Sequence, residues 1–147
     1  MARIHRLLTW PAALYIAGIL LWYEQYKLTR NPGSVWLFTV LSDWLFIHGY
    51  EKPFRLFVAS MEIAASVLVV IPYTRLWGAA LALGVMSGAI FFHLVSPLGI
   101  DPYHDGGALF KEACTVWLCA AFILLSYRAE IMTIIAGLLG HKKLASP

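Results

Sequence analysis

The sequence predicts an all-α integral membrane protein, a four-helix bundle with an interfacial or re-entrant helix in its first connection. Of the 147 residues, 61% are hydrophobic and 14% are aromatic, and the mean hydropathy of +0.74 exceeds that of ordinary soluble domains. Four segments approach the roughly 20 apolar residues that a bilayer span requires. No internal repeat, low-complexity tract or linker divides them, so we expect one transmembrane domain over residues 1–147.

The expected spans cover residues 7–27, 54–72, 76–95 and 107–127. The N-terminal span is expected to be retained, because no small-residue cleavage pattern follows its apolar centre. In the first connection, the run SVWLFTVLSDWLFIH is too short to span and too hydrophobic for a hydrated loop. We therefore expect a helix at about 34–48 that lies at the interface, capped by Asn31 or Ser34 with Pro32 in its first turn. The C-terminal run IMTIIAGLLG is also too short to cross, and is expected to extend the last helix along the surface.

Basic residues near the helix ends indicate the orientation. The side with both termini carries six: Arg3, Arg6, Arg75, Arg128, Lys142 and Lys143. The other side carries five: Lys27, Arg30, Lys52, Arg55 and Lys111. This balance favours cytoplasmic termini in a multi-pass protein of the bacterial cytoplasmic membrane. The lipid bilayer is thus the expected partner. Nucleic acid is not, because no basic patch with interleaved aromatics stands clear of the apolar segments.

Ionisable side chains gather at one end of the predicted bundle. Four antiparallel spans bring the end of the first, the start of the second, the end of the third and the start of the fourth to one side. The residues placed there are Glu24, Lys27, Glu62, His93, Lys111 and Glu112. Ionisable groups at membrane depth normally face the bundle interior or a water-filled cavity. A polar pocket that opens to one surface is therefore predicted.

Helical spacing suggests which side chains enter this pocket. Glu24 and Glu62 each share a helix face with small residues, which mark close contact between helices. We take Glu24, Glu62 and Glu112 as candidate catalytic groups that point at one another or at shared lysines. The candidate ligand-binding residues are Lys27, His93, His104, Asp105 and Lys111.

Purely structural roles are the alternatives for the loop residues. Asp105 before two glycines is a good N-cap for the last span, and His93 is placed to bond a loop carbonyl. His104 fits an interfacial position equally well. His93, Asp101, His104 and Asp105 together offer two imidazoles and two carboxylates, but their spacing matches no strong ligand pattern, so no metal site is predicted.

The third span carries a ridge of small residues. Ala80, Gly84 and Gly88 recur every four residues, so they lie on one helix face. Such ridges let another backbone come close. The ridge predicts tight packing, either within the bundle or in a homodimer.

Three stretches resemble the DoxX family of small four-helix membrane proteins. They are YEQYKLTRNPGSVWLF after the first span, MEIAASVLVVIPYTRLWGAALALGVM across the next two, and FFHLVSPLGIDPYHDGGALF before the last. The resemblance covers about residues 8–127 and implies an association with respiratory or thiol redox chemistry. It places the family's polar positions on Glu24, Lys27, Glu62, Arg75, His93 and Asp105. A neighbouring group oxidises dithiols through a Cys-x-x-Cys motif, which this chain lacks.

Three functions stay open on these grounds. In a quinone-linked oxidoreductase subunit, Lys27, Lys111 or His93 bonds the quinone oxygens and the carboxylates exchange protons with water. No haem, iron–sulfur or flavin motif is present, so the electrons would come from a redox partner protein. The second possibility is a carrier or binding protein for a small solute or ion, which would need to dimerise. The third is a non-catalytic assembly subunit whose charges lock the bundle.

Overall fold

The computed structural model describes residues 2–144, with side chains from Leu7 to Gly137, and this part of the chain contains six α-helices and no strand. Four helices are long and apolar enough to cross a membrane. They are α1 (Ala2–Leu28, counted as apolar from Leu7), α3 (Glu51–Val70), α4 (Arg75–Val95) and α5 (Ala108–Ser126). The predicted spans differ from these apolar portions by at most three residues at either end. The all-α membrane bundle is thus confirmed.

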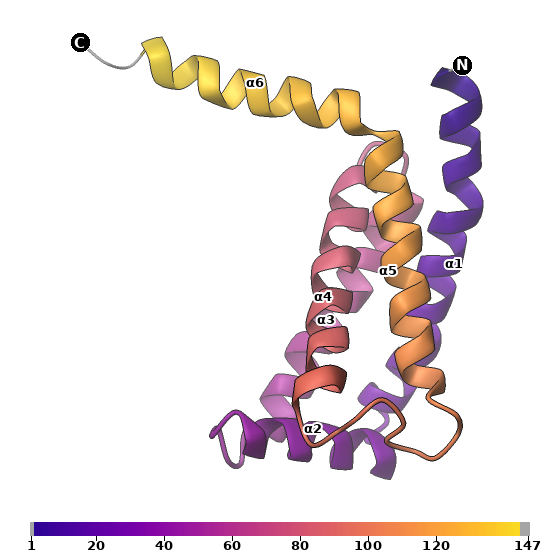
Figure 1. Cartoon of the computed structure of the whole chain (residues 1–147), viewed down its shortest axis with the longest axis vertical. Helices are drawn as coiled ribbons and strands as arrows, with labels where there is room; N and C mark the ends of the chain where they lie inside the picture. Colours follow the sequence, from indigo (N-terminus) through magenta and orange to yellow (C-terminus); the bar gives the residue numbers. More distant parts are fainter. Residues whose placement is uncertain (1, 145–147) are drawn as a thin grey trace.

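The four long helices pack as a ring in the order α1, α3, α4 and α5 (Figure 1). Their shared core lies toward the end of the bundle where α3 turns into α4, and its fully buried residues include Ala13, Ile16, Ala65, Val69, Ala79, Ala82, Val116, Ala120 and Ile123. Small side chains on facing helices let the backbones approach. One such close approach is at Gly78, where an added Cβ would lie 2.3 Å from the backbone nitrogen of Val69.

Helix α2 (Pro32–Trp44) lies across the opposite end of the bundle (Figure 1). Its cap is as predicted, because the Asn31 side chain accepts the N–H of Gly33 at 3.0 Å and Pro32 occupies the first turn. The helix begins at Pro32, two residues before the predicted 34. Phe38 and Leu41 belong to its buried face, which packs with Leu98 into a second, smaller core. The helix ends four residues before the predicted 48, because the chain turns there and Phe46 adopts a left-handed φ of 60°.

Helix α6 (Arg128–Leu144) follows the break at Tyr127 and leaves the bundle at a steep angle (Figure 1). The expected extension of the last span is therefore a separate helix. Its apolar side chains Met132, Ile134 and Ile135 are exposed.

Four of the basic residues used for orientation have side chains outside the described part of the chain: Arg3, Arg6, Lys142 and Lys143.

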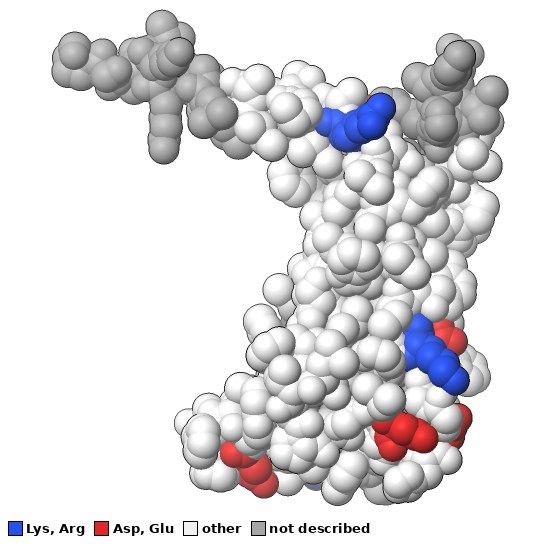
Figure 2. All heavy atoms as spheres, viewed as in Figure 1, with Lys and Arg blue, Asp and Glu red and all other residues white. Residues whose placement is uncertain are grey.

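Charged side chains lie toward the two ends of the molecule. Figure 2 shows an uncharged band around the middle of the visible face, with acidic side chains gathered at the end that carries α2. An uncharged band of this kind suits the hydrocarbon core of a bilayer. The ionisable end predicted from the sequence is thus the end covered by α2.

Candidate functional site

A buried ion-pair cluster joins α1 to α3. Lys27 Nζ lies 2.8 Å from Glu24 Oε1 and 2.6 Å from Glu62 Oε2. The two glutamates are only 2% and 5% exposed. These distances are typical of charge-assisted hydrogen bonds, which are stronger than neutral ones. One ammonium group is therefore shared by two buried carboxylates.

Small residues bring the two helices close enough for this contact. On α1, Ala13 and Ala17 lie on the same face as Glu24 and are buried with it. On α3, Glu62 is flanked on its buried face by Ala59, Ala65 and Ser66. The cluster thus sits at a close helix crossing, where water is largely excluded.

A fourth charged residue, Arg55, contacts the backbone of the cluster. It is 1% exposed, its Nε donates to Glu51 Oε1 at 2.5 Å, and its Nη1 donates to the backbone carbonyl of Lys27. That carbonyl is among the last of α1, which have no partner within the helix. From the sequence, Arg55 is only one of the basic residues near the helix ends that indicate the orientation. Arg55 lies four residues after Glu51 and seven before Glu62, so the three side chains share one helix face. This spacing could have indicated that Arg55 is buried.

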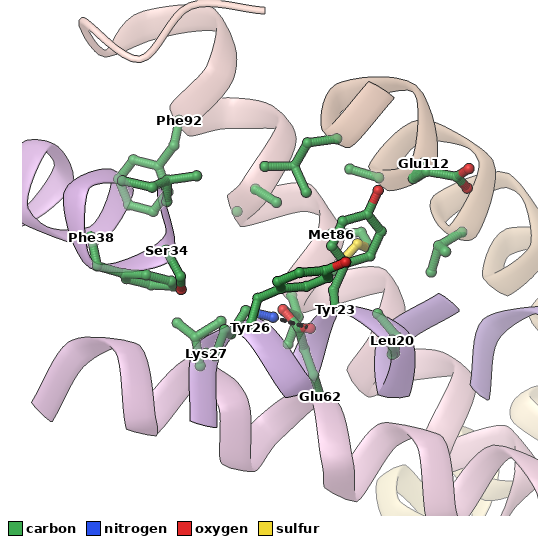
Figure 3. A pocket seen from close by; sticks show the side chains of 18 of the residues that line it. Leu20, Tyr23, Tyr26, Lys27, Ser34, Phe38, Glu62, Met86, Phe92 and Glu112 are labelled. Carbon is green, nitrogen blue, oxygen red and sulfur yellow. Dashed lines mark hydrogen bonds and ion pairs between the residues drawn. The ribbon is translucent and has the colours of Figure 1, made fainter. Parts of the chain in front are cut away.

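A cavity of about 820 Å³ opens beside the cluster, between the long helices and α2. Most of its wall is apolar and includes Phe38, Phe54, Val85, Met86 and Phe92. The polar lining comes from Tyr23, Tyr26, Lys27, Ser34, Glu62, His93, Tyr103, Asp105 and Glu112, with Asn31. In Figure 3, Lys27 and Glu62 lie together near Tyr23 and Tyr26, with Phe38 and Ser34 to one side and Glu112 on another wall. Apolar cavities of this size with few polar groups are typical of small-molecule sites.

The cavity wall reaches the lipid-facing surface of the bundle. Among its lining residues, Trp22 and Phe57 are 60% and 59% exposed. Gly84 and Gly88 also line it, and a Cβ added at either would meet no atom within 4 Å. Of the two alternatives for this ridge, tight packing within the bundle is not formed at Gly84 and Gly88, because α4 makes its close contact at Gly78 instead. Packing in a homodimer stays a prediction. The ridge leaves space beside the cavity.

Glu112 lies on a different wall from the ion-pair cluster. It is half-buried and accepts a hydrogen bond from the Tyr15 hydroxyl at 2.5 Å, which joins α5 to α1. Among the described side chains, Glu112 forms neither of the expected contacts, with the other glutamates or with a lysine. Lys111 is exposed and does not line the cavity. Tyr15 was missed because nothing in a single helix identifies its partner on another.

His93 and Asp105 line the cavity but also have structural contacts. The buried His93 places Nδ1 2.6 Å from the carbonyl oxygen of Gly99. Because a carbonyl can only accept, Nδ1 is the donor in this contact. Asp105 Oδ1 accepts the N–H of Ala108 at 2.9 Å, so it bonds the start of α5 as expected of a cap. The N-cap position itself is Gly107, in the left-handed conformation, and not Asp105 as predicted. His104 is exposed and lies outside the lining.

The loop between α4 and α5 is organised by Asp101. Its two carboxylate oxygens accept the N–H groups of Asp105 at 3.0 Å and Gly106 at 3.3 Å. Desolvation opposes ionisation of this carboxyl, but the backbone N–H groups of Gly107, Asp105 and Gly106 outweigh it and lower its pKa. Within the described part of the chain, no three His, Cys, Asp or Glu residues converge on a possible metal position.

Tyr103 connects the loop between α4 and α5 to α2. Its hydroxyl donates to the backbone carbonyl of Gly33 at 3.0 Å, and its ring lies against that of Trp36. Burial raises the pKa of this phenol, with further contributions from the negative charge of Asp105 and from Tyr23. The loop therefore forms a fixed edge of the cavity.

Arg75 lies at the other end of the bundle, away from the cavity. Its Nε donates to the carbonyl of Val69 at 3.0 Å, and its Nη1 donates to the Thr9 hydroxyl at 3.1 Å. The guanidinium also stacks on the ring of Trp10 at 4.0 Å. These contacts satisfy carbonyls at the end of α3, so Arg75 has a structural role there.

Comparison with known proteins gives one match. Residues 26–99 match the model of the DoxX-like family, whereas no curated protein and no solved structure matches the chain. The matched segment runs from the end of α1 to the loop after α4, and it contains Lys27, Arg55, Glu62 and His93. It covers half of the sequence, so this chain, with its four apolar helices and the Glu24–Lys27–Glu62 cluster between two of them, belongs to the DoxX-like family.

Proposed function

We propose that this protein binds a quinone in the 820 Å³ cavity and acts as a quinone-linked subunit of a membrane redox system. The observation that carries the proposal is a charged lysine at the wall of an otherwise mostly apolar cavity that reaches the lipid-facing surface. A quinone combines a flat apolar ring, two carbonyl acceptors and a tail that partitions into lipid. Its chemistry therefore complements both parts of the cavity.

The lining supplies the contacts that such a ring needs. Lys27 uses two of its three N–H donors on Glu24 and Glu62, which leaves one for a ligand carbonyl. The hydroxyls of Tyr23 and Tyr26 are further donors in the lining. The rings of Phe38, Phe54 and Phe92 form an edge-to-face group against which an aromatic ring can pack.

Electrons and protons would follow separate routes. Glu62 and Glu112 line the cavity and are suited to exchange protons with a bound quinone. The sequence holds no obvious haem, iron–sulfur or flavin motif, so a redox partner protein would supply the electrons. We place both termini in the cytoplasm of a bacterial cell, which would put the cavity at the outer face of the cytoplasmic membrane.

Mass spectrometry of the protein purified in mild detergent tests the binding proposal. We expect quinone in near-stoichiometric amount in the wild type, and its loss in Lys27→Met and in Glu62→Gln. Lys52→Met is the matched control, because Lys52 is exposed at the start of α3 and lies outside the cavity lining. Quenching of tryptophan fluorescence by added ubiquinone-1 gives a second measure, since Trp22 lines the cavity.

Two outcomes would count against a quinone. One is a folded wild type with no quinone beyond that of the co-purified lipid and no quenching by ubiquinone-1. The other is equal quinone content in the wild type and in Lys27→Met. A solute or ion flux in proteoliposomes that Glu62→Gln abolishes would then favour a carrier, and a loss of stability alone would favour an assembly subunit.

A further inference from the structure

The ion-pair cluster has unequal numbers of charges. Glu24 and Glu62 supply two carboxyl groups, whereas Lys27 is the one cation bonded to either of them among the described side chains. With all three groups ionised, the cluster has a net charge of −1. In addition, Glu24 Oε2 is buried and has no hydrogen-bond donor in the described part of the chain. Leaving a buried carboxylate oxygen without a donor is costly.

The neighbouring ionisable groups are engaged elsewhere. On α3, Arg55 is bonded to Glu51 and to the backbone carbonyl of Lys27. The other ionisable groups around the cavity include Tyr23 and Tyr26 on α1, His93 on α4, Glu112 on α5, and Tyr103 and Asp105 in the loop. On α2, Asp43 is exposed and pairs with His48. No hydrogen bond from any of these described groups reaches Glu24 Oε2.

The two carboxyl groups are themselves neighbours, because Glu24 Oε1 and Glu62 Oε2 bond the same Lys27 nitrogen at 2.8 Å and 2.6 Å. Two carboxylates in such contact repel, and a shared proton removes the repulsion. The same proton would turn the unsatisfied oxygen into one member of a hydrogen bond. It would also neutralise the cluster while Lys27 stays charged.

We propose that the Glu24–Lys27–Glu62 cluster is a binding site for one exchangeable proton, held between the two carboxyl groups at Glu24 Oε2. This site stands on the geometry of the cluster and does not depend on which ligand enters the cavity. Its coupling to a ligand does rest on the proposed function. Lys27 and Glu62 line the cavity. A ligand carbonyl that bonds Lys27 weakens the ion pairs of Lys27 with the two carboxylates. The carboxyl groups then bind the shared proton more tightly.

Infrared spectroscopy of the full-length protein without added ligand tests the site directly. At neutral pH we expect the C=O stretching band of a protonated carboxylic acid, shifted in D₂O. The band should be lost in Glu24→Gln and equally in Glu62→Gln, because the remaining carboxylate then forms a simple ion pair with Lys27. Asp43→Asn is the control and should keep the band, since Asp43 is exposed. A folded wild type without this band, or a band that survives in both glutamine variants, would overturn the proposal.

Unfolding measured against pH gives a second readout. The folded wild type holds a proton that the unfolded chain releases at neutral pH, so stability should fall as the pH rises and the proton dissociates. Each single glutamine variant is already neutral and should match the wild type at neutral pH but lack this alkaline loss. Glu24→Gln/Glu62→Gln leaves Lys27 unpaired and should be less stable than either single variant. An alkaline loss of the same size in the wild type and in both single variants would contradict the proton site.

Discussion

Arg55 donates a hydrogen bond to the backbone carbonyl of Lys27, the residue whose ammonium joins Glu24 to Glu62. The end of α1 is therefore held at both its main chain and its side chain by groups from α3. This double attachment fixes the position of the ammonium at the cavity wall. It also means that the geometry of the site depends on a residue that does not line the cavity.

Replacing Arg55 should destabilise the bundle. Arg55→Met leaves the Lys27 carbonyl without its donor and Glu51 without its cation, and breaking a buried pair of this kind costs about 3 kcal/mol. The side chain of Glu51 keeps 18% of its surface exposed, so water offsets part of this loss. The measurement is reversible unfolding in detergent. Lys52→Met on the exposed face of the same helix is the control, and an equal effect of the two changes would refute a special role for Arg55.

Two glycines of α4 should respond oppositely to alanine. At Gly78 a Cβ would meet the backbone of Val69, so Gly78→Ala should cost about 3 kcal/mol through overpacking. At Gly88 the Cβ meets nothing within 4 Å, and Gly88→Ala should be neutral or gain up to about 1 kcal/mol from helix propensity. Thermal unfolding of the two variants side by side measures the difference. Equal stability would show that α3 and α4 do not cross closely at Gly78.

Filling the space beside the cavity should block ligand binding without unfolding the protein. Gly84→Leu and Gly88→Leu place bulk where no atom lies within 4 Å of a Cβ, so we expect at least a tenfold weaker affinity for ubiquinone-1. Gly137→Leu is the matched control, since its Cβ is equally free but lies on α6. Unchanged binding in the α4 variants would place the ligand outside this cavity.

The bond between Tyr15 and Glu112 should appear as an energetic coupling. Hydrogen bonds to charged groups contribute roughly 2 kcal/mol, so Tyr15→Phe and Glu112→Gln should each lower stability by up to that amount. The double variant should lose less than the sum of the two, because both changes remove the same contact. Tyr73→Phe, in an exposed turn, is the control. Strict additivity in the cycle would contradict the contact.

Acid should loosen the loop between α4 and α5 through Asp101. Because its pKa is lowered in the folded state, the stabilisation is present above the ordinary carboxyl pKa of about 3.9 and is lost as the pH falls through the lowered value. Asp101→Asn should remove this acid-dependent part, whereas Asp43→Asn should not. Limited proteolysis of the loop between pH 3 and pH 7 would detect the change. The same pH profile in all three proteins would exclude Asp101 as its cause.

The fold and the location of the ionisable end followed from local properties of the chain. The length of each apolar run sets the spans, and the up-and-down order of four spans brings Glu24, Glu62, His93 and Glu112 to one end whatever their contacts. Asn31, Pro32 and Asp105 were also identified in advance, because caps depend on residues only a few positions apart.

The pairing of those residues was decided by tertiary structure alone. Periodicity tells which face of a helix is apolar, but not which neighbour that face meets or how far each helix is rotated about its axis. This rotation buries Arg55 within the bundle and leaves Lys111 exposed. It also brings Glu112 into contact with Tyr15 and not with Lys27. It also places the close helix crossing at Gly78 and leaves Gly84 and Gly88 beside the cavity. Contacts between helices join residues far apart in sequence, so they depend on how all the helices pack together.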